Sequence, residues 1–183
     1  MATLVNKLNR ADTADPERAF ERLFAAQYSQ VVAIAYRILG DIQAAEDVAQ
    51  DVFYAYHRQH APDAPYAAAW LHKAAAHAAY NAAISRARRE RRDQADLDGR
   101  RWTQVTEAGD PQAAVEAAEQ RRAVGEALSR LPEQHATVLL LRYSGLSYAE
   151  VAAALGVGIN QVGARLSRAE AALRKELTRD ASR

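Results

Sequence analysis

The chain lacks cysteine altogether and has few large aromatic residues. Its 183 residues include three Phe and two Trp, while 49% are hydrophobic, many of them alanine. Without cysteine, disulfide bonds and thiolate metal sites are excluded, and a reducing compartment is compatible with the composition. The scarcity of bulky aromatics favours thin helical bundles over a large β core.

Two kinds of segment are also missing. No stretch alternates Val, Ile and Thr as a half-buried strand does. No apolar run is long enough for a secretory signal or a membrane span. We therefore expect an all-α, cytoplasmic protein with no direct membrane insertion, large enough for two small domains.

Charge is nearly balanced overall but unevenly distributed. The formal net charge is +1. Residues 12–59 hold eight acidic residues against four arginines, whereas residues 86–92 (RARRERR) hold five arginines against Glu90. One part of the surface is thus suited to a protein partner and another to phosphate groups.

Apolar residues at three- and four-residue steps predict three helices in the first half of the chain. The first begins near Phe20 and ends at Gly40, and the second covers residues 45–56 with a strongly acidic polar face. Pro62 and Pro65 then break the chain into a short loop. The third runs from about Tyr66 into the arginine cluster, and we expect it to bury Trp70, Leu71, Ala74, Ala78 and Ile84.

Periodicity is lost over residues 93–111, where Gly, Asp and Thr gather as in a linker. We therefore expect a flexible linker at 93–111 between domains at 15–92 and 112–180. Helical stripes resume after Pro111, which suits a first helical turn. Pro132 opens a further helix.

Residues 147–169 carry the pattern of a helix-turn-helix. Ser147 and Glu150 fit a capping box at a helix start, and Gly156 suits a sharp turn after about two helical turns. The next helix, from about Ile159, is expected to bury Val162, Leu166, Ala169, Leu173 and Leu177. Side chains that could read DNA share its opposite face; they are Asn160, Gln161, Ala164, Arg165 and Arg168. Taken alone, this pattern also fits a solvated helical hairpin.

Three segments together resemble a known family. AEDVAQDVF at 45–53, AWLHKAAAHAAYNAAISRARR at 69–89 and ALSRLPEQHATVLLLRYSGLSYAEVAAALGV at 127–157 resemble the extracytoplasmic-function sigma factors of the sigma-70 family, across nearly the whole chain. The resemblance implies two helical domains and a promoter-specificity subunit. Such a subunit binds core RNA polymerase and directs transcription initiation at −10 and −35 elements, with no enzyme activity and no cofactor of its own.

The resemblance also assigns roles to residues. Asp47, Gln50 and Asp51 match positions that contact the clamp helices of the polymerase β′ subunit. The loop around residues 60–68 and the helix from Trp70 would capture and melt the −10 element, and the helix-turn-helix would bind the −35 element. The positions implied near the −10 DNA are Trp70, Lys73, His77, Asn81, Arg86, Arg88 and Arg89. Other implied partners are the polymerase β subunit, promoter DNA and an anti-sigma factor.

The chain departs from the family pattern at both DNA sites. His77 and Asn81 stand where the family commonly has Asn and Asp. In the recognition helix, Gly158, Asn160-Gln161 and Gly163-Ala164 replace Ser, Gly-Thr and Lys-Ser. We therefore expect an altered −35 preference. Gly163 inside a helix costs about 1 kcal/mol relative to Ala.

Other functions fit the sequence less well. A stand-alone helix-turn-helix regulator, whose N-terminal helices form a dimerisation or ligand module, is the main alternative, and a protein-interaction adaptor is another. His57, His60, His72 and His77 lack the spacing of a helical metal site. The acidic residues lack an accompanying nucleophile, base and oxyanion donor, so catalysis is not expected.

Overall fold

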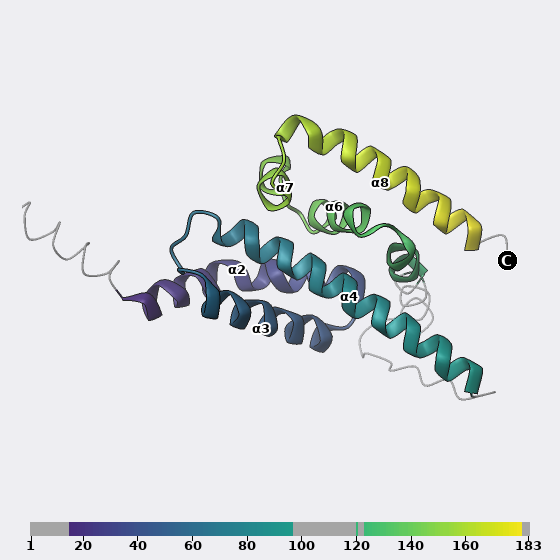
Figure 1. The fold of residues 1–183 in the computed structure, drawn as a ribbon, viewed down its shortest axis with the longest axis horizontal. Coiled ribbons are helices and arrows are strands. Elements are labelled where there is room, and N and C mark those ends of the chain that lie inside the picture. The colour runs from purple at the N-terminus through teal and green to yellow at the C-terminus, as the bar shows by residue number, and fades with distance from the viewer. Residues whose placement is uncertain (1–14, 97–119, 121–122, 181–183) are drawn as a thin grey trace, which may run out of the picture.

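Helices are the only regular secondary structure among the described residues of the protein. The structure is a computed structural model, and it describes residues 15–96, 120 and 123–180. Its helices run in the order α2 (Pro16–Leu39), α3 (Ile42–Gln59), α4 (Ala67–Asp96), α6 (Glu133–Tyr143), α7 (Tyr148–Leu155) and α8 (Ile159–Asp180), with residues 123–130 also helical. The prediction of an all-α fold is confirmed (Figure 1).

Local sequence signals set the first two helices. Asp15 caps α2, because its carboxylate accepts a hydrogen bond from the Glu17 amide at 3.1 Å, and Pro16 occupies the first turn. The helix therefore begins before Phe20, where we had predicted its start. It ends as predicted at Gly40, whose φ of +66° is left-handed. Asp41 immediately caps α3, so the two helices form a tight hairpin.

Helices α2, α3 and α4 pack into an N-terminal bundle. Its buried side chains include Val31, Ile34, Phe53 and Leu71. The prediction for α4 was right for Leu71 but wrong for Trp70, Ala74, Ala78 and Ile84, which are only partly buried. Instead, Ala75, Ala76 and Ala79 are fully buried on α4, which packs against α2 and α3 and also against α6 and α7.

A second set of helices forms the C-terminal half. Helix α6 packs against both α7 and α8, and Val151, Val162 and Leu166 are buried where these helices meet. The Arg130–Glu176 ion pair, at 3.3 Å, joins residues 123–130 to α8. Leu173 and Leu177 were predicted to be buried but are only partly so, because they line an open hollow beside Tyr143 at the end of α6.

The C-terminal half rests on α2 and α4, on the side away from α3 (Figure 1). This leaves one face of α3 uncovered by either half. Helix α4 continues to Asp96, past the expected domain end at 92. Most of the expected linker, and the start of the helix expected after Pro111, lie outside the described residues. None of the helices described is long and apolar enough to cross a membrane.

Candidate functional site

The acidic stripe lies on the outer face of α3. Asp47, Gln50 and Asp51 are all exposed, opposite the side on which Ala45, Ala49, Val52 and Tyr56 are buried. Their i, i+3, i+4 spacing puts them side by side on the helix. The two carboxylates and the amide therefore form one continuous polar surface that the C-terminal half does not touch.

Sequence reasoning missed an aromatic residue beside this stripe. Tyr54 follows Gln50 and Asp51 by one helical turn and is 63% exposed. The Arg58 guanidinium lies 5.6 Å from the centre of its ring, a cation–π arrangement. A tyrosine so exposed on a helix whose other aromatics are buried is typical of a contact surface. The signal in the sequence was its position on the polar face of the second predicted helix.

Four aromatic rings gather where α3 leads into α4. The rings of His60, Tyr56 and Trp70 contact one another, with the His60 centroid 5.0 Å from Tyr56 and 4.8 Å from Trp70, and His60 also packs edge-on against Tyr66 at 5.8 Å. The Tyr56 hydroxyl donates to the carbonyl of Ala61 at 2.8 Å. These contacts hold the loop from His60 to Tyr66, and about half of the Tyr66 side chain remains exposed. Aromatic faces of this kind can stack unpaired bases.

Helix α4 carries a second, polar stripe. Trp70, Lys73, His77 and Asn81 recur at three- and four-residue steps and so share one face. Lys73 and Asn81 are exposed, as are Arg86 and Arg89 further along; Arg88 lies on the same helix. The His77 side chain is less exposed than those of Lys73 and Asn81. Its Nδ1 lies 2.5 Å from a carboxylate oxygen of Glu133, at the start of α6.

His72 is buried on the neighbouring side of α4. Its side chain is 4% exposed, and its Nε2 donates to the Gln27 Oε1 at 2.9 Å. Burial lowers the pKa of His72, an effect that the nearby Glu150 carboxylate partly opposes. His72 is therefore a neutral hydrogen-bond donor inside the protein.

This burial predicts loss of stability in mild acid. The unfolded chain takes up a proton on His72 near the ordinary pKa of about 6.5, whereas the folded chain resists it to lower pH. Between these two pKa values the unfolded state binds more protons, so the free energy of unfolding falls as the pH falls. Urea unfolding across pH 5–8 should show a smaller pH dependence in His72→Gln than in the parent. Equal slopes in the two proteins would contradict the assignment.

The helix-turn-helix has the predicted local geometry. Ser147 and Glu150 form the capping box, with Glu150 N donating to Ser147 Oγ at 3.3 Å and Ser147 N donating to the Glu150 carboxylate at 2.7 Å. The Ser147 hydroxyl also donates to the Glu150 carboxylate, at 2.7 Å, and this hydrogen bond, with the smaller effect of the Ser147 N–H, lowers the pKa of Glu150. Gly156 ends α7 with a left-handed φ of +67°. The turn then directs the first residues of α8 outward.

The candidate base-reading side chains lie on the first turns of α8. Asn160, Gln161, Ala164 and Arg168 are exposed, whereas Arg165 is half-buried at the edge of the packed face. We had predicted all five on one open face. Arg165 departs from it because it lies one helical turn from both Val162 and Ala169, which are buried on the inner side of α8.

Two departures from the family pattern are physically linked. A Cβ at Gly158 would lie 2.7 Å from the Asn160 Oδ1, so any larger residue at 158 would force the Asn160 side chain to move. Asn160 therefore occupies the space beside Gly158 at the helix start. A serine at 158 and this placement of Asn160 exclude each other.

Gly163 offers a simple test of the recognition helix. A Cβ at this position would meet no atom within 4 Å, and its φ is not left-handed. We expect Gly163→Ala to stabilise the protein by about 1 kcal/mol, because alanine loses less backbone entropy in a helix. Thermal unfolding measures the gain. Unchanged or lowered stability would show that this turn of α8 is not helical in solution.

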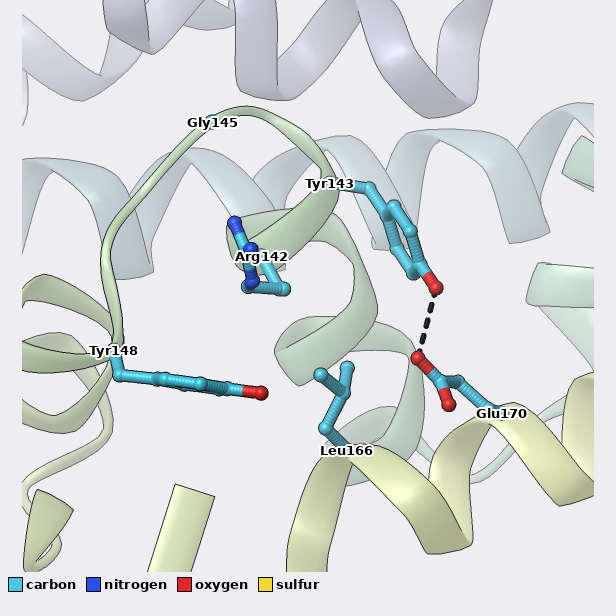
Figure 2. A pocket seen from close by; sticks show the side chains of 6 residues that line it. All are labelled: Arg142, Tyr143, Gly145, Tyr148, Leu166 and Glu170. Atoms are coloured by element: carbon cyan, nitrogen blue, oxygen red, sulfur yellow. Dashed lines mark hydrogen bonds between the residues drawn. The ribbon is translucent and has the colours of Figure 1, made fainter. Parts of the chain in front are cut away.

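A pocket of about 420 Å³ lies between α6, α7 and α8 (Figure 2). Tyr143 donates to the Glu170 carboxylate at 2.8 Å, which raises the pKa of the phenol, and Arg142 lies over the Tyr148 ring at 5.5 Å. The Arg142 guanidinium also donates to the Leu146 carbonyl at 3.2 Å. The Tyr143–Glu170 hydrogen bond joins α6 to α8, and the contact of Arg142 with Tyr148 joins α6 to α7. Among the described residues, no three His, Asp or Glu side chains converge as metal ligands.

Two protein-family models match the chain. They follow each other along the sequence in the same order as the stripes on α3 and α4 and the helix-turn-helix. The model for sigma-70 region 2 matches residues 23–93, which contain the α3 and α4 stripes. The model for sigma-70 region 4 matches residues 121–173, which contain the helix-turn-helix. A stand-alone regulator gains no support, because the N-terminal match is to a sigma-factor region.

Several curated proteins are similar over nearly the full chain. SigM of Mycobacterium tuberculosis, an ECF RNA polymerase sigma factor, is 34% identical over 176 residues, covering 93% of this chain and 83% of SigM. The RNA polymerase sigma-H factor of Pseudomonas aeruginosa is 28% identical, with 95% and 92% coverage. SigW of Bacillus subtilis, also an ECF sigma factor, is 27% identical, with 97% and 98% coverage.

Among solved structures, CnrH in complex with the cytosolic domain of CnrY has the same fold. Its TM-score is 0.53 at 23% identity, and the match covers 93% of this chain and 95% of CnrH. The ordered matches to regions 2 and 4, and the full-length similarity to SigM, agree with the resemblance in the sequence. The chain belongs to the extracytoplasmic-function sigma factors, the sigma-70 family members through which bacterial RNA polymerase recognises promoters.

Proposed function

We propose that this sigma factor docks on core polymerase through α3, engages the −10 element through α4 and the loop before it, and reads the −35 element through the first turns of α8. The observation that carries the proposal is the uncovered acidic stripe of Asp47, Gln50 and Asp51. A repressor that acts alone has no use for such a surface beside a DNA-binding half. A basic helix pair on the polymerase β′ clamp is its expected partner.

The proposed roles of α3 and α4 follow from the charges that each helix carries. The acidic stripe on α3 would repel DNA, whereas Lys73, Arg86 and Arg89 on α4 would attract phosphates. Tyr66 and Trp70 offer rings on which bases of a melted strand can stack. We assign residues 15–92 to polymerase docking and −10 recognition, 93–111 to the linker, and 112–180 to −35 recognition.

The proposal also extends to the catalytic role, the cellular location and the regulation of the protein. The protein would supply promoter specificity while the core enzyme makes RNA, so it would have no catalytic activity of its own. It would work in the cytoplasm with the polymerase, and an anti-sigma factor would mask its polymerase- and DNA-facing surfaces. Another sigma factor, RpoE of Bartonella quintana, has been crystallised with the anti-sigma factor NepR.

Run-off transcription tests the proposal directly. Purified protein is mixed with core polymerase and a library of genomic promoters, and the selected start sites give both promoter elements. We expect defined transcripts that depend on the protein. Tight operator binding without polymerase, with no transcripts in its presence, would favour a stand-alone regulator instead.

A further inference from the structure

The turn before α8 holds the start of that helix in one position. The Val157 amide donates to the Ala152 carbonyl at 3.0 Å, which ties the turn back to α7. The Gln161 amide donates to the Gly158 carbonyl at 2.9 Å and closes the first turn of α8. A helix that starts from a fixed turn can present its first side chains to DNA in a defined geometry.

Gly158 stands at the position where a capping side chain is expected. It directly precedes Ile159, the first residue of α8, and its φ is not left-handed. The backbone would therefore accept serine, which caps a helix at least as well as glycine because its hydroxyl accepts a hydrogen bond from an amide of the first turn. The stability of the helix alone gives no reason for glycine at this position.

The Asn160 side chain occupies the space that a side chain at 158 would need. A Cβ at Gly158 would lie 2.7 Å from the Asn160 Oδ1, too close for both atoms to keep these positions. Side chains on a helix tilt toward its N-terminus, and here the Asn160 amide lies back across the start of α8. Both residues are exposed. Only a residue without a side chain at 158 leaves the amide in this place.

An asparagine amide at the start of a recognition helix has a preferred base. The amide presents a donor and an acceptor side by side, and this pair matches the N7 acceptor and the N6 donor of adenine in the major groove. The N-terminal residues of a recognition helix are those that reach base edges. Asn160 is the second residue of α8, so its chemistry and its position both favour adenine.

Ile159 brings complementary chemistry to the same helical turn. Its side chain is 59% exposed, and an aliphatic group this exposed gains free energy when another apolar group covers it. In the major groove the thymine methyl is the apolar group that a base pair offers. An amide suited to adenine and an aliphatic side chain suited to thymine therefore stand on consecutive residues, and both favour an A·T base pair.

We propose that Gly158 is a positioning residue for −35 recognition: because it has no side chain, the Asn160 amide lies across the start of α8 and, together with Ile159, recognises an A·T base pair of the −35 element. The inference rests on the proposed function, since α8 must lie in the major groove of that element. A side chain at 158 would displace the Asn160 amide and weaken the preference for this base pair.

Selection from a promoter library tests the choice of base pair. The library randomises the −35 element, holoenzyme made from this protein and core polymerase selects the promoters that it binds, and sequencing gives the preference at each position. For the parent we expect a position at which A·T is preferred over G·C at least about tenfold. Asn160→Ala should abolish that preference and keep those at other positions. An unchanged preference in Asn160→Ala, or a parental preference for G·C at the position that it affects, would overturn the assignment.

Two substitutions of Gly158 separate positioning from helix capping. Gly158→Ser and Gly158→Ala both place a Cβ against the Asn160 amide, but serine caps a helix well and alanine caps it poorly. We expect both to lower the A·T preference at least about fivefold, although the alanine variant should melt about 3 °C below the serine variant. If the serine variant kept the parental preference while the alanine variant lost it, capping rather than the position of Asn160 would set the preference.

A double variant shows whether Gly158 acts through Asn160. Gly158→Ser should weaken holoenzyme binding to the selected promoter about fivefold in the parent, but less than about twofold in Asn160→Ala, because no amide remains to be displaced. An equal loss in both backgrounds would overturn the positioning role of Gly158. The proposed function would fail in a different way, since the parent would then select no −35 sequence and give no run-off transcript.

Uracil in place of thymine tests the contact of Ile159. The exchange removes the methyl group of the base and keeps its pairing with adenine. Thymines of the selected −35 sequence are replaced one at a time, and we expect one replacement to weaken binding of the parent at least about threefold, because a buried methyl group is lost. The same replacement should have little effect on Ile159→Ala. Equal sensitivity of the two proteins at every thymine would overturn the role of Ile159.

Discussion

Reversing two charges on α3, Asp47→Arg together with Asp51→Arg, is expected to weaken core polymerase binding at least 100-fold. Both carboxylates are exposed and lie one helical turn apart. Against a basic partner, each reversal replaces an attraction by a repulsion, and such pairs contribute several kcal/mol where the interface excludes water. A 100-fold loss corresponds to about 2.7 kcal/mol. Titration of labelled protein with core polymerase measures the loss directly.

The control is a second double reversal, Glu17→Arg with Glu21→Arg. Both residues are exposed on α2 and change the net charge by the same amount. Their loss removes a favourable acid from the first turn of that helix, which costs under about 1 kcal/mol of stability. We expect this control to bind core polymerase like the parent. If both doubles lost binding equally, overall charge rather than the α3 stripe would be responsible.

The sequence predicted the helices well wherever a local signal marked a boundary. Gly40 and Gly156 end helices with left-handed backbones, and Ser147 with Glu150 forms the capping box. These signals act over a few residues and need no tertiary context. The start of α2 was placed too late because the apolar stripe begins at Phe20, whereas the cap that starts the helix is Asp15.

Packing between the halves was not predictable from periodicity. The alanines of α4 were read as one amphipathic face, yet Ala75, Ala76 and Ala79 are buried and Trp70 is only partly so. Alanine is compatible with either side of a helix, so its position carries little information about which side is covered. The covering helices come from more than 50 residues away, as the Tyr80–Leu131 bond shows with a separation of 51 residues.

Some features of the candidate site could also be predicted from the sequence, and others could not. The exposed positions of α3 and most of those on α8 follow from helical geometry, because a residue opposite the buried stripe must face outward. The pairing of His77 with Glu133, the half-burial of Arg165 and the contact of Asn160 with the space beside Gly158 depend on side chains brought together by the fold. These three details concern the positions that depart from the family pattern or adjoin them.

Removing two outward side chains from the recognition helix, Gln161→Ala with Arg168→Ala, is expected to reduce binding to the −35 element at least about 30-fold. A good contact between a side chain and a base edge is worth about 1–3 kcal/mol, so two contacts at the lower limit give about 2 kcal/mol. Both residues are exposed, and neither packs in the helix-turn-helix core. Binding of polymerase holoenzyme to promoter DNA measures the effect, and core polymerase binding should not change.

Sequence discrimination separates base reading from simple phosphate contact. Arg174→Ala with Lys175→Ala removes two positive charges from exposed positions nearer the end of α8, and we expect it to leave −35 discrimination intact. The informative comparison is a cycle of two proteins and two promoters, with and without base changes in the −35 element. For the parent, those changes should weaken binding. The same base changes should weaken binding of the Gln161→Ala, Arg168→Ala variant much less, because the side chains that distinguish the bases are gone. If the variant discriminated between the promoters as strongly as the parent, its weaker binding would reflect lost phosphate contacts, and the −35 reading would belong to other residues.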